Sequence, residues 1–184
     1  MINQIKTKRL ILRNYIIEDI NNVHRLKSEP MVWCFSTNVA SSKMEDSEIY
    51  LKGILNNYSK NNCAFQALFL KETGEYIGEA GILAHIMPNN RVVVGYNLLP
   101  EYWGNGYATE ITKALVKYLF GIEKVERIEV LVADGNGASR KVLEKSGFMQ
   151  EGLLRNFGYI HNRLINVYYY GIIRDDYSGK LIES

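Results

Sequence analysis

The sequence predicts a mixed α/β fold, in which helices flank a central, twisted and mostly antiparallel sheet. Residues 64–99 hold three apolar runs separated by turn residues, a pattern typical of an antiparallel meander. After Pro100 the spacing of apolar residues becomes helical, and at Arg127 it returns to that of a strand, which predicts one β-α-β crossover. Two amphipathic segments precede the meander and predict two helices near the N-terminus.

The N-terminal third predicts one strand and two helices. Residues 10–12 form a short apolar run between two arginines, as expected for a strand. A first helix follows, because apolar residues recur at helical spacing over residues 20–26, just after two acidic residues. A second helix is predicted over about residues 43–58, where Ser42 and Glu45 have capping-box spacing and an apolar stripe follows.

The remaining elements follow from alternating runs of strand and helix pattern. The meander predicts strands over residues 64–70, 76–85 and 92–99. Further along, the pattern predicts a helix around residues 111–119, a strand over 127–132, a helix over 136–145, and strands over 148–154 and 164–173.

The composition is that of an ordinary globular protein. Of the 184 residues, 47% are hydrophobic and 23% are charged, which excludes the disordered, collagenous and coiled-coil classes. This length suits one domain, so we expect a single domain over residues 1–184. The net charge is +2 and the basic residues form no block, so we do not expect a nucleic-acid partner.

Neither a membrane span nor a secretory signal is expected. Arg13 interrupts the first apolar run, and no run reaches the ~20 residues that cross a bilayer. Cys34 and Cys63 form no CxxC pair and the three histidines are scattered, so we expect neither a disulfide nor a metal site. These features predict a cytoplasmic protein.

A glycine-containing turn between a strand and a helix is the most informative segment. Gly104, Gly106 and Ala108 would let the backbone approach a ligand closely, and the free N–H groups at the start of the helix suit a pyrophosphate. The same glycines could also make a tight turn without a ligand. A P-loop is excluded because no Gly-Lys-Ser/Thr follows the turn. A dinucleotide site with Asp134 as its acid fits less well, because Thr109 stands at the third glycine position and only one crossover is predicted.

Asn136 and Ser139 stand one turn apart at the start of a predicted helix. Their side chains can both point toward a ligand at that end of the helix. Asparagine and serine are also ordinary helix caps, so the pattern alone leaves both interpretations open.

Three segments occur in the order and spacing of a known superfamily. They are Trp103-Gly104-Asn105-Gly106-Tyr107-Ala108, Asn136-Gly137-Ala138-Ser139 and Lys145-Ser146-Gly147-Phe148. Together they resemble the GNAT superfamily of acyl-CoA-dependent N-acyltransferases, and the resemblance implies the GNAT fold. More narrowly, the chain is similar to the branch named for ribosomal-protein N-terminal acetyltransferases, the RimJ/RimL type. This likeness rests on Thr7-Lys8-Arg9-Leu10-Ile11-Leu12-Arg13, Gly95-Tyr96 and Glu151-Gly152-x-Leu154-Arg155.

The resemblance implies acetyl-CoA as the co-substrate and no metal. It implies that the turn holds the coenzyme pyrophosphate through the backbone of Trp103, Gly104, Asn105, Gly106, Tyr107, Ala108 and Thr109. The preceding strand would separate from its neighbour and pair with the pantetheine arm at Asn97 and Leu98. Asn136 would contact the same arm, and Ser139 would lie near the sulfur. Because Trp103 stands where the superfamily commonly has Gln or Arg, an arginine clamp on the phosphates is not assumed.

The resemblance also bears on the acid and the base of the reaction. Many GNAT enzymes carry a tyrosine, proposed to protonate the departing thiolate, at the position of Leu143. Ser139 takes over that assistance here, by donating a hydrogen bond to the developing thiolate. No sequence motif identifies the catalytic base. The candidates are Glu79 in the meander and Glu151 after the crossover, and the alternative for each is an ordinary surface carboxylate.

We therefore expect direct transfer of an acetyl group from acetyl-CoA to a primary amine in a ternary complex. The favoured acceptor is a protein or peptide N-terminus. An α-amino group of pKa ~7.7–8.0 is roughly a tenth neutral at pH 7, whereas a lysine of pKa ~10.4 is neutral in well under a thousandth of molecules. The alternatives are a small amine (a polyamine, an amino sugar or an aminoglycoside), a non-catalytic acyl-CoA sensor and a nicotinamide-dependent oxidoreductase. Homo-oligomer formation stays open.

Two departures from the branch concern the acceptor. Val93 and Asn166 stand where relatives commonly carry acids, so both positions lack a negative charge. Four aromatic residues are candidates for an acceptor slot, with core packing as the alternative for each. They are Trp33, Phe35, Tyr159 and Tyr168.

Overall fold

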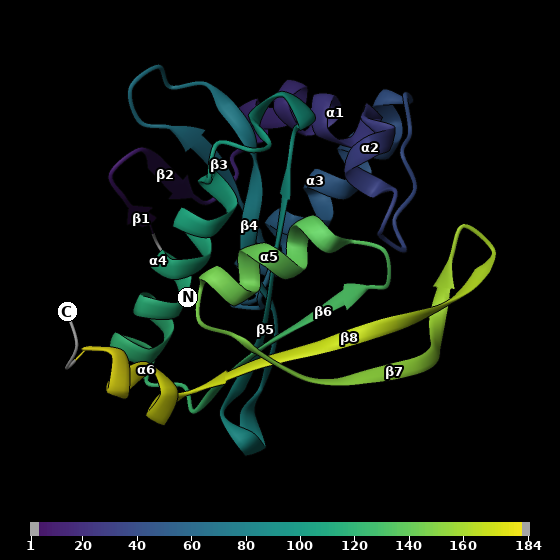
Figure 1. The fold of residues 1–184 in the computed structure, drawn as a ribbon. Coiled ribbons are helices and arrows are strands. Elements are labelled where there is room, and N and C mark those ends of the chain that lie inside the picture. The colour runs from purple at the N-terminus through teal and green to yellow at the C-terminus, as the bar shows by residue number, and fades with distance from the viewer. Residues whose placement is uncertain (1–3, 182–184) are drawn as a thin grey trace.

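The computed structural model describes residues 4–181, and within this range one eight-stranded sheet has the order β1-β2-β3-β4-β5-β6-β8-β7 (Figure 1). Its strands are β1 (Gln4–Lys6), β2 (Leu10–Arg13), β3 (Phe65–Leu70), β4 (Tyr76–Ile86), β5 (Arg91–Leu98), β6 (Arg127–Ala133), β7 (Met149–Ile160) and β8 (Arg163–Ile173). The α-helices are α1 (Ile20–Ser28), α2 (Pro30–Trp33), α3 (Met44–Ser59), α4 (Tyr107–Gly121), α5 (Gly137–Lys145) and α6 (Arg174–Leu181). Short 3-10 turns are η1 (Ile17–Asp19), η2 (Met87–Asn89) and η3 (Pro100–Tyr102). All neighbouring strands are antiparallel except β5 and β6, so the predicted fold class is confirmed.

The strands and helices predicted from the sequence are all present, but one boundary was wrong. The strand predicted over residues 148–154 continues to Ile160, because an irregularity between Leu154 and Gly158 interrupts the alternation of side chains. Strand β1 and helices α2 and α6 were not predicted. β1 has three residues and α2 has four, which is too short for a period to show, and α6 carries few apolar residues.

Helices cover both faces of the sheet (Figure 1). Helices α1, α2 and α3 share a core with one face, and its buried residues include Val23, Leu26, Trp33, Leu51 and Ile54. Helices α4 and α5 pack on the other face, through Ile111, Leu115, Val116, Leu119 and Leu143. The consecutive β3 residues Ala67 and Leu68 belong to different cores, as the alternation of side chains across a strand requires.

The only parallel pair of this sheet comes apart at its carboxyl end. β5 and β6 are paired at Arg91–Arg127, Val92–Ile128 and Val93–Glu129, and no later pair is formed within the described chain. β5 nevertheless stays paired with β4 as far as Leu98, and β6 stays paired with β8 as far as Ala133. The edge of β5 beyond Val93 therefore offers backbone groups that no strand uses. This confirms the separation that the family resemblance implied.

Strands β7 and β8 form a long hairpin that projects past the N-terminal end of α5 (Figure 1). Its tip reaches the α2 region, where the His161 ring nitrogen Nε2 lies 3.3 Å from the carbonyl oxygen of Trp33. In the described part of the chain, no helix is long and apolar enough to cross a membrane.

Candidate active site

The turn before α4 is built to leave its amides free. Gly104 and Gly106 have φ values of +77° and +78°, in the left-handed region that glycine adopts without strain. Gly106 is the N-cap of α4, and no side chain caps this helix. Among the described residues, no hydrogen-bond acceptor pairs with the backbone N–H groups of residues 104–109. These amides and the positive end of the helix dipole form a site for a diphosphate.

The N-terminal segment holds this turn in place. Glu110 accepts hydrogen bonds from the Thr7 hydroxyl at 2.6 Å, the Arg9 backbone N–H at 2.9 Å and Arg9 Nε at 2.7 Å. Arg9 Nη1 also donates to the carbonyl of Asn105 at 3.0 Å, and its guanidinium lies 4.5 Å from the centre of the Tyr107 ring. Partial burial acts to raise the pKa of Glu110, but the hydrogen bonds from Thr7 and Arg9 outweigh it and lower that pKa.

Trp103 fixes the other end of the turn. Its indole Nε1 donates to the carbonyl of Leu98 at 2.7 Å, so the start of the turn is tied to the last residue of β5. The Trp103 side chain is therefore a structural anchor in this position, and the groups of this turn that could donate to a diphosphate are backbone amides.

Ser139 lies in the first turn of α5, with its hydroxyl directed at β5. Asn136 caps the helix by accepting the Ser139 backbone N–H at 3.1 Å, so the capping interpretation is confirmed. Its side-chain NH₂ has no recorded partner in the described chain and can still donate to a ligand. The Ser139 Oγ lies 2.8 Å from the hydroxyl of Tyr96 on β5.

Tyr96 is a site residue that sequence reasoning did not single out. Burial raises the pKa of Tyr96 to about 12, against the opposing effect of its hydrogen bond with Ser139. The Gly95-Tyr96 motif was visible, but its partner lies 43 residues further along the chain. The position that holds a tyrosine in many GNAT enzymes is Leu143, which is fully buried in the core.

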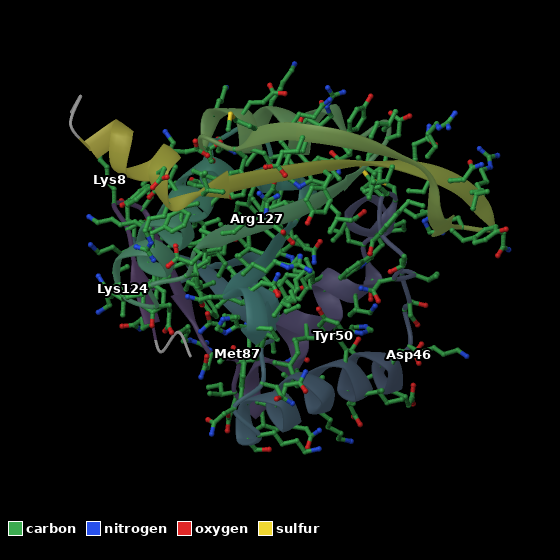
Figure 2. The ribbon with its side chains drawn as sticks, turned by 90° about the horizontal axis from the view of Figure 1, so that it is seen from below. Lys8, Asp46, Tyr50, Met87, Lys124 and Arg127 are labelled. Atoms are coloured by element: carbon green, nitrogen blue, oxygen red, sulfur yellow. The ribbon has the colours of Figure 1, made fainter. Side chains whose placement is uncertain are left out.

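Glu79 is a fully buried carboxylate on β4, opposite Asn97 of β5. It accepts hydrogen bonds from the Tyr50 hydroxyl at 2.7 Å, Asn97 Nδ2 at 2.8 Å and the Tyr15 hydroxyl at 3.0 Å. Figure 2 shows Tyr50 on the side of α3 that faces the sheet. Burial raises the pKa of Glu79, and the three hydrogen bonds oppose this rise without cancelling it.

The two candidate catalytic groups lie on opposite faces of β5. Tyr96 and Asn97 are consecutive, so their side chains point to opposite sides of the sheet. Tyr96 contacts Ser139 on the α5 side, whereas Asn97 contacts Glu79 on the α3 side. A thioester bound along the open edge of β5 would thus have a hydroxyl on one side and a carboxylate on the other.

Glu151 is not part of this arrangement. It lies on β7 and forms two hydrogen bonds with the guanidinium of Arg127, one of them 2.9 Å long. Arg127 is the first residue of β6, at the opposite end of that strand from α5, and also binds Glu129 at 2.7 Å. The structure therefore places Glu151 in an ion-pair network at the other end of β6 from Ser139, and its role as a base stays a prediction.

The four predicted slot aromatics have different surroundings. Trp33 is buried in the core with its Nε1 bonded to the carbonyl of Leu26 at 2.9 Å. Tyr168 packs under the guanidinium of Arg140, and Tyr159 is exposed on the hairpin. Phe35 alone lies beside the α5 loop, where a Cβ on Gly135 would be 3.4 Å from its ring.

No cluster of three metal-binding side chains occurs among the residues the structure describes, and Cys34 and Cys63 are both free thiols.

Comparisons with known proteins agree with this geometry. A family model for the acetyltransferase (GNAT) domain matches residues 9–149. The uncharacterized N-acetyltransferase p20 of Bacillus licheniformis is 32% identical over 181 residues, which cover 94% of this chain and 97% of that protein. The solved structure of RimL, a ribosomal L7/L12 alpha-N-protein acetyltransferase in complex with coenzyme A, has a TM-score of 0.83 at 20% identity and covers 95% of this chain and 99% of its own. A spermidine N-acetyltransferase from Vibrio cholerae, in complex with CoA and spermine, has a TM-score of 0.82 at 19% identity, with 94% and 99% covered.

At these identities the two solved structures establish the shared fold, whereas the family match covers most of the chain. The free amides before α4, the open edge of β5 and the match over residues 9–149 lead to one conclusion. The chain belongs to the GNAT acetyltransferase family and is an acetyl-CoA-dependent N-acetyltransferase.

Proposed function

We propose that this enzyme acetylates the N-terminal α-amino group of a protein or peptide, as enzymes of the ribosomal-protein type do. The observation that carries the proposal is the placement of the Tyr96–Ser139 pair and Glu79 on the two sides of the open β5 edge. The acceptor class follows from the need for a neutral amine. An α-amino group is easier to deprotonate than a lysine by ~2.5 pKa units, or ~3.4 kcal/mol.

The coenzyme has a continuous path along residues already described. Its diphosphate binds the free amides of residues 104–109, and its pantetheine arm pairs with the edge of β5 at Asn97 and Leu98. The NH₂ group of Asn136 donates to the same arm. On this path the sulfur lies beside Ser139. The acetyl group then lies at the open edge of β5, with Ser139 on one side of the sheet and Glu79 on the other.

The reaction is a direct acyl transfer. The neutral amine attacks the thioester carbonyl, a carbon–nitrogen bond forms, and the carbon–sulfur bond breaks to release a thiolate. The Tyr96 and Ser139 hydroxyls are hydrogen-bond partners; when Tyr96 donates the hydrogen bond to Ser139 Oγ, the Ser139 hydroxyl can donate its own hydrogen bond to the sulfur. The proton lost by the amine passes to Glu79, whose pKa is raised by burial, so that this carboxylate is a stronger base than an exposed one. Since Glu79 is fully buried, this proton travels through a water or the hydroxyl of Tyr15 or Tyr50.

The test is a thiol-release assay with acetyl-CoA against peptides, polyamines and amino sugars. We expect the highest kcat/KM with peptides that have a free α-amino group, and no transfer to the same peptides after their N-terminus is blocked. The Ser139→Ala variant should turn over more slowly than wild type, while Ser146→Ala at the other end of α5 should not.

Other outcomes select the alternatives. Faster transfer to spermidine than to any peptide would assign a small-amine acceptor. Binding of acetyl-CoA in calorimetry without transfer to any amine would assign a coenzyme sensor. We also propose that the enzyme is cytoplasmic. The free thiols of Cys34 and Cys63 agree with a reducing compartment, and cell fractionation tests the location.

A further inference from the structure

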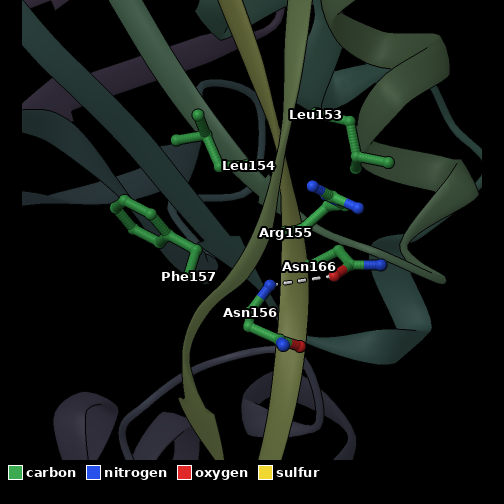
Figure 3. A pocket seen from close by; sticks show the side chains of 6 residues that line it. All are labelled: Leu153, Leu154, Arg155, Asn156, Phe157 and Asn166. Carbon is green, nitrogen blue, oxygen red and sulfur yellow. Dashed lines mark hydrogen bonds between the residues drawn. The ribbon is translucent and has the colours of Figure 1, made fainter.

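An open pocket of about 710 Å³ lies on the β7–β8 hairpin (Figure 3). It is lined by Leu153, Leu154, Arg155, Asn156, Phe157 and Asn166. The pocket forms at the irregularity that interrupts the pairing of β7 with β8. At this point Asn156 has a φ of +49°, and its backbone N–H donates to the Asn166 side-chain oxygen at 3.0 Å. The break in the ladder is thus held by a specific hydrogen bond and forms a fixed wall of the pocket.

The pocket adjoins the proposed site of acetyl transfer. The carbonyl of Asn166 accepts the backbone N–H of Asp134 at 2.9 Å, directly after the end of β6. Two residues later, Asn136 caps α5 and holds the backbone of Ser139. Asp134 is two Cα–Cα steps of ~3.8 Å from Asn136, and Asn136 is one helical turn of ~5.4 Å from Ser139, so Asp134, which holds Asn166, lies at most roughly 13 Å from Ser139. An extended peptide advances ~3.3–3.6 Å per residue, so the residues just behind a reacting N-terminus can reach the pocket.

The pocket lining carries a single positive charge. Arg155 is the one charged residue of its lining, and no carboxylate of the described chain forms an ion pair with it. Figure 3 shows Arg155 on the same side of the hairpin as Asn166, with Leu154 and Phe157 on the other side. A chain that crosses the hairpin here meets a guanidinium and an amide on one side and two partly exposed apolar side chains on the other.

We propose that Arg155 binds a carboxylate of the acceptor, so that the preferred substrates are peptide N-termini with an acidic residue next to the reacting one. A guanidinium presents a planar fork of donors that matches a carboxylate with two parallel hydrogen bonds. On the same side of the hairpin, Asn166 adds a neutral amide and Leu153 an apolar side chain for the rest of the peptide (Figure 3). A polyamine would bring ammonium groups toward Arg155 and be repelled. This inference rests on the proposed N-terminal acceptor and names its class.

The test compares two synthetic peptides that differ only at their second residue, glutamate in one and lysine in the other. For wild type we expect kcat/KM to favour the glutamate peptide by about tenfold, which corresponds to ~1.4 kcal/mol. Arg155→Gln should remove the preference, and Arg155→Glu should invert it. The matched control is Arg163→Glu on the same hairpin, which makes the same charge change outside the pocket and should keep the wild-type preference. The melting temperature of each variant confirms its folding.

The outcomes separate this inference from the function on which it rests. Transfer to both peptides with a ratio unaffected by Arg155→Glu would overturn the carboxylate site and leave the N-terminal acceptor standing. Equal effects of Arg155→Glu and Arg163→Glu would also overturn it, because the effect would then come from net charge. Transfer to spermidine but to neither peptide would overturn both proposals.

Discussion

Arg9 and Glu110 form an ion pair of 2.7 Å across 101 residues of sequence, at the base of the turn that precedes α4. The pair joins the loop before β2 to the first turn of α4, and Arg9 also holds the carbonyl of Asn105 inside the turn. If the turn binds the coenzyme diphosphate as proposed, the N-terminal motif supports that binding through the backbone of the turn. We expect the Arg9 contact with the Asn105 carbonyl to help hold the free amides in place.

Arg9→Ala should weaken coenzyme binding. The pair is partly exposed, with side-chain exposures of 43% and 19%, so we expect a loss of about 1 kcal/mol, or about fivefold in Kd for coenzyme A. Titration calorimetry measures it. Lys52→Ala, which removes an exposed ion pair with Glu48 on α3, is the matched control and should leave Kd unchanged. An unchanged Kd for Arg9→Ala would show that the turn keeps its shape without the pair.

Tyr96→Phe should lower kcat by a smaller factor than Ser139→Ala. Loss of the tyrosine hydroxyl removes the hydrogen-bond partner that orients the Ser139 hydroxyl, whereas loss of the serine hydroxyl removes the group that we propose to contact the sulfur. We expect about tenfold for Ser139→Ala and a few-fold for Tyr96→Phe, on the scale of single hydrogen bonds. The double variant should resemble Ser139→Ala, since the two hydroxyls act as a unit. Additive losses in kcat would contradict that arrangement.

Glu79 should give the activity and the stability a dependence on pH. The pKa of Glu79 is raised in the folded state from its usual 4.5, so the folded protein binds more protons than the unfolded one between these two values. The contribution of this proton binding to the free energy of unfolding is fully present below pH 4.5, and it is lost as the pH rises through the pKa of Glu79 in the folded state. Urea unfolding across this window should show stability falling with pH in wild type and a smaller fall in Glu79→Gln.

The same variant tests the catalytic role of Glu79. Wild-type kcat should drop as the pH falls through the raised pKa, because a protonated Glu79 accepts no proton. Glu79→Gln should have a low kcat without that acid limb. The control is Glu129→Gln, which changes another buried carboxylate, one that is ion-paired with Arg91 and Arg127, and should keep the wild-type pH profile. An acid limb that persists in Glu79→Gln would assign it to another group.

Glu151→Gln should leave kcat unchanged and lower stability. Glu151 pairs with Arg127, and the side chains are 35% and 24% exposed, so the expected loss is about 1 kcal/mol or less in the free energy of unfolding. Denaturant titration and the thiol-release assay are the two measurements. A fall in kcat at unchanged stability would restore Glu151 as a base candidate.

Local sequence signals accounted for most of the fold, because each long element has a clear period. The stripe of α3 and the meander of β3, β4 and β5 were predicted to within a residue or so of their boundaries. The end of β7 was missed because a bulge at Leu154 alters the alternation on which the prediction depends. Bulges are common next to functional sites, and the periodicity of a short segment does not show where such a site lies.

The candidate site was only partly predictable. The turn at Gly104 and Gly106 is local, so glycine and helix-start signals marked it. The Tyr96–Ser139 contact and the hydrogen bonds to Glu79 join residues that are far apart in sequence, so no spacing rule indicated them. For the same reason the pattern could not distinguish Glu79 from Glu151, although the first is buried at the open edge and the second is neutralised by an arginine.

The early separation of β5 from β6 leaves a gap in the sheet that the proposed coenzyme path would fill. The part of β5 after Val93 is an unpaired strand edge in the middle of the sheet. Unpaired edges of this kind can pair with strands of other chains. In the coenzyme path that we propose, the pantetheine arm pairs with this edge and covers it. Because a ligand that binds only the native state adds RT ln(1 + [L]/Kd) to its stability, we expect the supply of acyl-coenzyme to set the resistance of this enzyme to unfolding as well as its rate.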